Sequence, residues 1–318
     1  MQINERRLIS IGGFPQRIHL WSEQKEAPVI LFLHGGPGDP IRHKVKKSLL
    51  PLAKDYALAV IDERGAGGSF NAALKAEDLS LENYLSDIKE WTEYLKKRFH
   101  QGKIYLIGHS FGSLLAVHAI KNDPSSYAAY LGVGQFVDGP KSLSVQYDLL
   151  LSKIAALGDA LVEKRLQEIG KPTNGSFKND ADLEYFLSKL YPILEPAGYP
   201  SFQKREIIPF LRSTEYSLKE KREFKKARAL SEEAKGSVLH LQIQSLDPLG
   251  YSFKVPFYIA QGTEDFITPY SLAKEYAEKI RAPKKGFLSY SSSMHQPLFE
   301  EPERFIIDVR NRFRESTD

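Results

Sequence analysis

Positions 108–112 read Gly-His-Ser-Phe-Gly and match the pattern G-x-S-x-G. The apolar run 104–107 before them favours a buried strand, and the apolar residues 114–120 after them favour a helix. The chain must therefore turn sharply in between, where small glycines let the strand and the helix approach each other. Such a turn exposes a hydroxyl group, and we predict Ser110 as a nucleophile. The alternative is a glycine-rich turn with an incidental serine.

A serine hydroxyl reacts well only when a base removes its proton and a carboxylate orients that base. Where a turn of this kind carries such a triad, the chain order is serine, then Asp or Glu, then histidine. Of the eight histidines in the sequence, only His295 follows the last predicted strand, 286–290. We predict that His295 is the base, placed in a polar loop at the end of that strand.

The acid of such a triad should leave the C-terminal end of the preceding predicted strand, 257–260. Glu264 and Asp265 are neighbours in the loop that follows this strand. We choose Asp265 as the acid and keep Glu264 as the alternative. Either residue could also be a solvated loop carboxylate without a catalytic role.

Attack by a serine on a carbonyl group creates an oxyanion, which preorganised N–H donors stabilise. One donor should be the backbone N–H of Phe111, directly after the nucleophile. The other should come from the loop His-Gly-Gly-Pro-Gly at positions 34–38, which follows the buried run 29–33. We predict Gly36 as this second donor.

The elements that must position these residues alternate between strand and helix. Two short strands, 8–11 and 17–21, suggest an edge hairpin, and the unbroken apolar run 57–61 suits a strand covered on both faces. An amphipathic helix is expected over 81–99 and a further strand over 130–133. This alternation predicts an α/β fold with a mostly parallel central sheet flanked by helices.

The alternation of predicted strands and helices stops at about position 138. Helical patterns occupy 143–157, 180–194 and 218–234, and strand signals return only near position 256. We therefore predict an α/β core formed by residues 1–137 and 247–318, with residues 138–246 inserted as a helical cap. Its many aromatic side chains suit a lid over an apolar pocket, although a buried helical core is equally aromatic.

Composition narrows the functional classes. The chain has 318 residues, of which 42% are hydrophobic, and a net charge of +4, which supplies no strong field for nucleic acid or an acidic membrane. It has no cysteine, no signal-peptide pattern and no apolar run long enough to span a bilayer. We expect a cytoplasmic protein that needs no cofactor and no metal and acts on a small molecule or short peptide. Its oligomeric state does not follow from the sequence.

Taken together, these motifs resemble the α/β-hydrolase superfamily and, within it, the proline iminopeptidase branch. The motifs that carry the resemblance are His34-Gly-Gly-Pro-Gly38, Asp62-Glu-Arg-Gly-Ala-Gly-Gly-Ser69, Gly108-His-Ser-Phe-Gly-Ser113, Gly262-Thr-Glu-Asp265 and His295 followed by Glu301-Pro302. The resemblance implies a triad of Ser110, Asp265 and His295, an oxyanion hole at Gly36 and Phe111, and a helical cap. It also implies structural roles for Asp62 and Arg64, which would hold the glycine loop in place.

The sequence differs from that branch at positions expected to determine substrate specificity. Iminopeptidases usually have Gly-Ser-Trp around the nucleophile, where this chain has His-Ser-Phe at 109–111, and Gln where Glu63 stands. In that branch, glutamates of the cap hold the amine of the substrate, but no motif transfers them here. The cap glutamates that remain candidates are Glu184, Glu195, Glu206 and Glu215.

The main hypothesis is a serine hydrolase with an acyl-enzyme mechanism, inclined to proline iminopeptidase-like release of an N-terminal residue from short peptides. A carboxylesterase for small apolar acyl esters is the alternative, because esterases and lipases share the His-Ser-Phe form. A hydrolase-fold binding protein without catalysis is the third hypothesis, and a complete candidate triad disfavours it.

Overall fold

The computed structural model describes residues 1–239 and 245–316, and its centre is an eight-stranded sheet in the order β1-β2-β4-β3-β5-β6-β7-β8. The strands β1 and β2 form an antiparallel hairpin at one edge, and β2 also pairs antiparallel with β4. The remaining neighbours, β4-β3-β5-β6-β7-β8, pair in parallel. The strand bounds are Ile3–Ile11, Phe14–Ser22, Val29–Leu33, Ala57–Ile61, Ile104–His109, Tyr127–Val133, Phe257–Gly262 and Lys285–Tyr290. The expected mostly parallel α/β sheet is confirmed.

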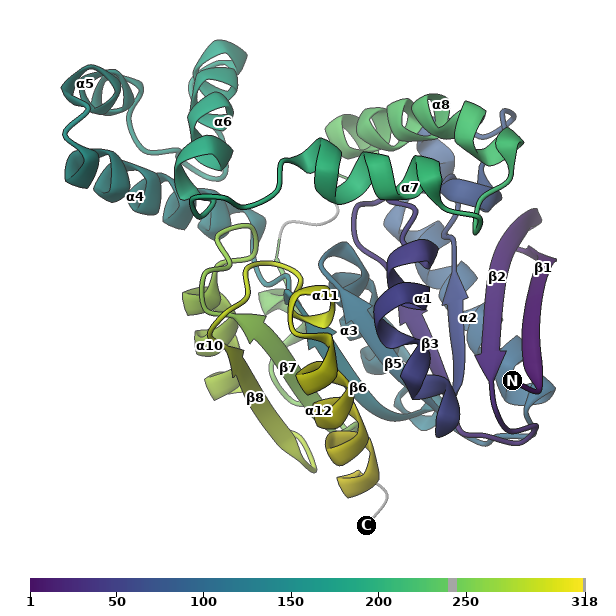
Figure 1. The fold of residues 1–318 in the computed structure, drawn as a ribbon. Helices are drawn as coiled ribbons and strands as arrows, with labels where there is room; N and C mark the ends of the chain where they lie inside the picture. Colours follow the sequence, from purple (N-terminus) through teal and green to yellow (C-terminus); the bar gives the residue numbers. More distant parts are fainter. Residues whose placement is uncertain (240–244, 317–318) are drawn as a thin grey trace.

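Helices cover both faces of this sheet because its central strands are apolar on both sides. Every residue of β3 is buried, and Leu31 packs in the cluster formed by α2 (Leu81–Arg98), α3 (Phe111–Asn122) and α10 (Tyr270–Lys279). Phe32 points the other way, into the cluster with α1 (Arg42–Leu49) and α12 (Pro302–Glu315). Figure 1 shows the two helical layers on either side of the strands.

Between β6 and β7 the described residues form helices, turns and two isolated β-bridges, Asp138–Ser245 and Thr173–Ser176, but no strand of the sheet. The bounds of the helices and helical turns up to residue 239 are α4 (Gly139–Leu157), α5 (Ala160–Ile169), α6 (Asp180–Leu194), a π-helical turn (Gln203–Ile207), α7 (Ile208–Arg212), α8 (Leu218–Ala234) and a second π-helical turn (Lys235–Leu239). We call residues 139–239 the inserted helices. Residues 240–244 of the predicted cap lie outside the described part of the chain.

The inserted helices form two groups above the carboxyl ends of the strands (Figure 1). The group α4–α6 stands over β7 and β8, where Tyr147 and Phe186 form an apolar cluster with Phe266 and Met294. Local capping fixes where the helices begin: Asp138 accepts a hydrogen bond from the N–H of Lys141 at the start of α4. The group α7–α8 stands over the other half of the sheet (Figure 1).

A buried ionic cluster, which we call the Arg42 network, joins α8 to the core. Arg42 is fully buried, its Nε lies 3.0 Å from Asp62 Oδ1, and its Nη2 donates to Glu220 Oε1 at 2.5 Å. Its Nη1 donates to the carbonyl oxygen of Glu215 at 3.0 Å and to Nε2 of His19 at 2.8 Å. Burial and the Arg42 charge lower the pKa of His19 to about 2, so the imidazole is neutral and accepts this bond.

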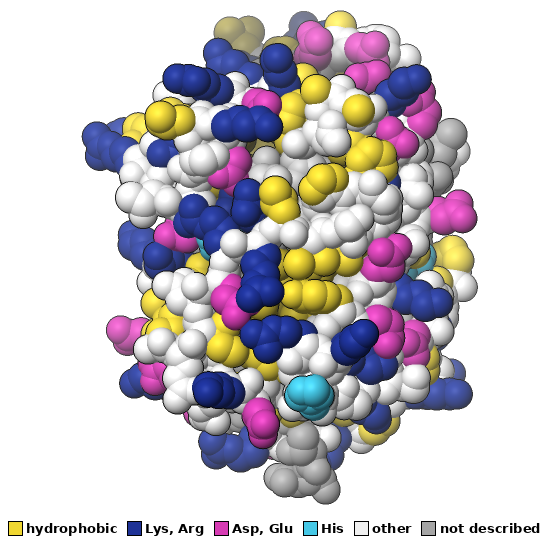
Figure 2. Space-filling model, turned by 90° about the vertical axis from the view of Figure 1, so that its right-hand side faces the viewer, with side chains coloured by type: hydrophobic (Ala, Val, Ile, Leu, Met, Phe, Trp, Pro, Cys, Tyr) yellow, Lys and Arg dark blue, Asp and Glu magenta, His cyan; other side chains and the backbone are white. Residues whose placement is uncertain are grey.

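The surface carries charges of both signs. Figure 2 shows Lys and Arg side chains interspersed with Asp and Glu on the face that includes the β1–β2 edge, in keeping with the small net charge of +4. Among the described residues, no helix has the length and apolar character needed to cross a membrane.

Candidate active site

Ser110 occupies the turn between β5 and α3, and its backbone is held in an unusual conformation. Its φ of 53° and ψ of −120° lie outside the regions that most residues adopt. Its N–H donates to the carbonyl oxygen of Val133 at 2.9 Å, and its carbonyl oxygen accepts from the hydroxyl of Ser113 at 2.6 Å. A Cβ on Gly112 would overlap the carbonyl oxygen of Leu33, so only glycine lets α3 lie this close to β3.

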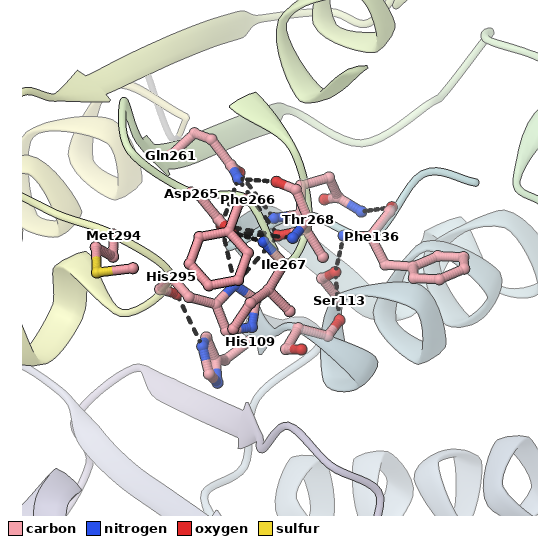
Figure 3. Close-up of polar contacts among 12 residues, drawn as sticks. His109, Ser113, Phe136, Gln261, Asp265, Phe266, Ile267, Thr268, Met294 and His295 are labelled. Atoms are coloured by element: carbon pink, nitrogen blue, oxygen red, sulfur yellow. Dashed lines mark hydrogen bonds and ion pairs between the residues drawn. The ribbon is translucent and has the colours of Figure 1, made fainter. Parts of the chain in front are cut away.

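His295 lies in the loop after β8 and contacts Asp265, which lies in the loop after β7 (Figure 3). The distance between His295 Nδ1 and Asp265 Oδ2 is 2.9 Å. The Asp265 side chain is fully buried and also accepts hydrogen bonds from Gln261 Nε2, Thr268 Oγ1, and the N–H groups of Ile267 and Thr268. Because Asp265 Oδ2 accepts from His295 Nδ1, the imidazole carries its proton on Nδ1 and Nε2 is left to act as a base.

The neighbouring carboxylate has a different position. Glu264 is exposed to solvent, and its N–H donates to the carbonyl oxygen of Ser293 at 3.3 Å. The structure therefore brings Asp265, rather than Glu264, against His295.

Three residues that the sequence did not single out hold this pair in place. Gln261 bridges the site, because its Nε2 donates to Asp265 while its Oε1 accepts from the N–H of Gln135 at 2.8 Å. His109 Nε2 donates to the carbonyl oxygen of His295 at 3.2 Å, and burial lowers the pKa of His109 well below its usual value. Gly134, with φ of 53°, leaves room for the imidazole: a Cβ there would lie 2.9 Å from His295 Nδ1. Gln135 with Gln261, and His109 and Gly134 with His295, are far apart in the sequence, so no local sequence pattern predicts these contacts.

The glycine loop lies directly against the nucleophile turn. A Cβ on Gly35 would lie 3.0 Å from the Cβ of Ser110, and Gly36 has a φ of 123°, which side chains disfavour. Phe111 is the first residue of α3, so its N–H has no partner within the helix. Within the described residues, Ser110 Oγ makes no hydrogen bond to His295; such bonds are often long before substrate binds.

Asp62 and Arg64 hold other segments than the glycine loop. Asp62 accepts from the N–H of Gly68 at 2.6 Å, and Arg64 forms an ion pair with Asp87 of α2 at 2.6 Å. The glycine loop is instead contacted by Glu63, whose Oε1 lies 3.0 Å from His34 Nδ1 and accepts from the N–H of Gly38 at 3.4 Å.

Three of the four glutamates proposed for the substrate amine, Glu195, Glu206 and Glu215, already have a cationic partner. Glu195 lies 3.4 Å from Arg205, and Glu206 lies 2.9 Å from Lys44. Glu215 is buried in contact with Lys46 at 2.5 Å, while Glu184 is exposed. Within the described residues, no group of three or more His, Asp or Glu side chains could hold a metal ion.

The model of the alpha/beta hydrolase fold family matches residues 28–302, which span the nucleophile turn and both loops of the contacting pair. The chain belongs to the alpha/beta hydrolase fold family. Among curated relatives of this hydrolase, the "Probable aminopeptidase YbaC" of Bacillus subtilis (strain 168) is 26% identical over 304 residues, 93% of this chain and 92% of that protein. A proline iminopeptidase of Lactobacillus acidophilus is 30% identical over 107 residues, 33% of this chain and 34% of its own length.

Solved structures show the same fold in proteins with different activities. The proline iminopeptidase of Mycobacterium smegmatis is 15% identical with a TM-score of 0.66, and the match covers 98% of each chain. A membrane phospholipase A is 13% identical with a TM-score of 0.64, and the match covers 99% of this hydrolase and 87% of that chain. At such identities the likeness concerns the fold alone, and the resemblance to the proline iminopeptidase branch rests on the aminopeptidase and iminopeptidase relatives.

Proposed function

We propose that this protein is a serine hydrolase in which Ser110 is the nucleophile, His295 the base and Asp265 the acid. The observation that carries this proposal is the buried Asp265–His295 contact of 2.9 Å, on loops at the same edge of the sheet as the strained Ser110 turn. A structural ion pair would need no free imidazole nitrogen and no strained serine turn at the same edge of the sheet.

In the proposed reaction, Ser110 Oγ forms a bond to the carbonyl carbon of the substrate while its proton moves to His295 Nε2. Asp265 keeps the proton on Nδ1 and stabilises the imidazolium. The oxyanion accepts hydrogen bonds from the N–H groups of Gly36 and Phe111. When the carbonyl re-forms, the leaving group takes the proton from His295 and departs, and water then hydrolyses the acyl-enzyme by the same steps.

For the substrate, we propose an N-terminal residue released from a short peptide. The support is the aminopeptidase named among the relatives that match almost the whole chain. The inserted helices, as part of a cap proposed to extend over residues 138–246, would then limit the length of peptide that reaches Ser110. The carboxylesterase alternative uses the same triad and differs only in the leaving group and the absence of an amine site.

Two variants test the catalytic assignment. Ser110→Ala and His295→Ala should each lower kcat by about 10⁴-fold or more, and the double variant should be little worse, because triad members act as one unit. A fluorophosphonate probe should label Ser110, as read by peptide mass spectrometry. Labelling at another serine, with Ser110→Ala still active, would contradict the assignment.

A substrate panel tests the reaction class. Proline 4-nitroanilide and its N-acetylated form both release 4-nitroaniline, and 4-nitrophenyl butyrate releases 4-nitrophenol, so kcat/KM for all three can be measured by absorbance. We expect the free-amine anilide to exceed its acetylated form by at least tenfold. Turnover of the ester alone would favour the carboxylesterase.

A further inference from the structure

Asp39 follows the glycine loop and lies beside the proposed oxyanion hole. Its Cγ lies 3.5 Å from the position that a Cβ on Gly36 would take. Its side chain is exposed, and within the described residues it makes no hydrogen bond and no ion pair. A carboxylate in this position has free acceptor oxygens beside the reacting carbonyl.

Asp39 lies next to the place where the inserted helices meet the glycine loop. A Cβ on Gly38 would overlap the side chain of Ser231, so α8 packs directly on the loop. Desolvation by the surrounding protein raises the pKa of Asp39 above its ordinary value, while the positive charges of Lys235 and His34 act in the opposite direction. Asp39 is thus close to the inserted helices while its own side chain stays exposed.

The charged neighbours of Asp39 on the inserted helices already have partners. Lys235 Nζ lies 3.2 Å from Glu232, and Arg228 Nε lies 4.0 Å from the same carboxylate. Glu206 contacts Lys44, as described above. Asp39 is thus the carboxylate that these described neighbours leave unpaired.

We propose that Asp39 binds the free ammonium group of the substrate's N-terminal residue; this inference rests on the proposed function and names its specificity-determining residue. In such a substrate the nitrogen lies two bonds, about 2.5 Å, from the scissile carbonyl carbon. A carbonyl oxygen held at Gly36 therefore places the ammonium within a few bond lengths of the residue three positions further along the loop. The amine site comes from the core loop and not from the glutamates of the inserted helices.

The same carboxylate also disfavours substrates that lack the amine. A negative charge beside the oxyanion hole opposes the negative charge that develops on the oxyanion. A substrate ammonium between the two groups neutralises this repulsion, whereas a neutral ester leaves it in place. Asp39 therefore selects free-amine substrates both by attraction and by penalising neutral ones.

The test compares the wild type with Asp39→Asn and with Glu206→Gln as the matched control. For proline 4-nitroanilide, we expect Asp39→Asn to lower kcat/KM about 10²-fold, because the substrate ammonium loses its charged partner. Its kcat/KM for 4-nitrophenyl butyrate should stay the same or rise, and the Glu206→Gln ratio should match that of the wild type. Competitive inhibition by prolinamide should weaken with Asp39→Asn in parallel, which a purely structural role would not produce.

Each other outcome overturns the inference. If Asp39→Asn keeps the wild-type ratio of free-amine to ester turnover, Asp39 does not bind the amine. If Glu206→Gln loses that ratio instead, the site belongs to the inserted helices. If the wild type itself does not prefer the free amine over its N-acetylated form, the aminopeptidase proposal fails together with this one, and the wild-type measurement alone reveals it.

Discussion

Replacing Arg42 with Met tests whether the Arg42 network holds α8 to the core. Methionine keeps much of the volume but removes the charge and all the donors that face Asp62, Glu220, His19 and the Glu215 carbonyl. Removing one partner of a buried ion pair leaves the other charges without compensation, at a cost of about 3–5 kcal/mol. Asp62 keeps its bond from the N–H of Gly68, which places the expected loss at the lower end of that range.

Urea and thermal unfolding, followed by circular dichroism, measure this loss. At about 2 °C per kcal/mol for a chain of this size, Tm should fall by roughly 6–8 °C. Lys46→Met is the matched control, because Lys46 also contacts Glu215 but is partly exposed, so its pair contributes below about 1 kcal/mol. An Arg42→Met protein no less stable than Lys46→Met would show that the network does not hold α8 to the core.

Two further predictions concern the acid and the pH dependence of stability. Asp265→Asn should lower kcat about 10⁴-fold without unfolding the protein, because the amide no longer fixes the productive histidine tautomer. Glu264→Gln should remain active. Steady-state rates of both variants with the best substrate check this, and the reverse pattern would reassign the acid to Glu264. Folding lowers the pKa of His19 from 6.5 to about 2. Below pH 6.5 the His19 imidazole therefore binds a proton in the unfolded chain but not in the folded one. Stability should therefore fall by up to about 1.4 kcal/mol per pH unit below pH 6.5. Urea unfolding at pH 5 and pH 7 should show a shallower fall for His19→Gln, and equal slopes would contradict a neutral His19.

The sequence predicted the sheet well where burial leaves an apolar signal on both faces of a strand. The runs 29–33 and 57–61 coincide with β3 and β4. The edge strand β1 is longer than the expected 8–11, because its outer residues are exposed and polar and carry no apolar pattern. Short α5 and α7 were not anticipated for a similar reason: a few turns give too little periodicity to recognise.

For the candidate site, the loops after β7 and β8 could be located because the parallel sheet brings their carboxyl ends to one edge. The supporting contacts could not be found in this way. Gln261 through Gln135, His109 and the Arg42 network all contact partners far away in the chain, and the spacing of such residues has no fixed period. Asp39 is a single Asp in a Gly-Asp-Pro turn, where the residue type suits the turn itself and so conceals any further role.

The two groups of inserted helices pack on different loops of the candidate site, so each group could be exchanged without the other. The group α4–α6 packs against Phe266 and Met294, the immediate chain neighbours of Asp265 and His295. The side chain of Gln146 adds a hydrogen bond to the carbonyl oxygen of Phe266 at 3.0 Å. In contrast, α8 rests on the glycine loop through Ser231. A chimera that takes α4–α6 from a relative should therefore alter the positions of the proposed acid Asp265 and base His295. One that takes α7–α8 should alter the glycine loop and the proposed amine site at Asp39.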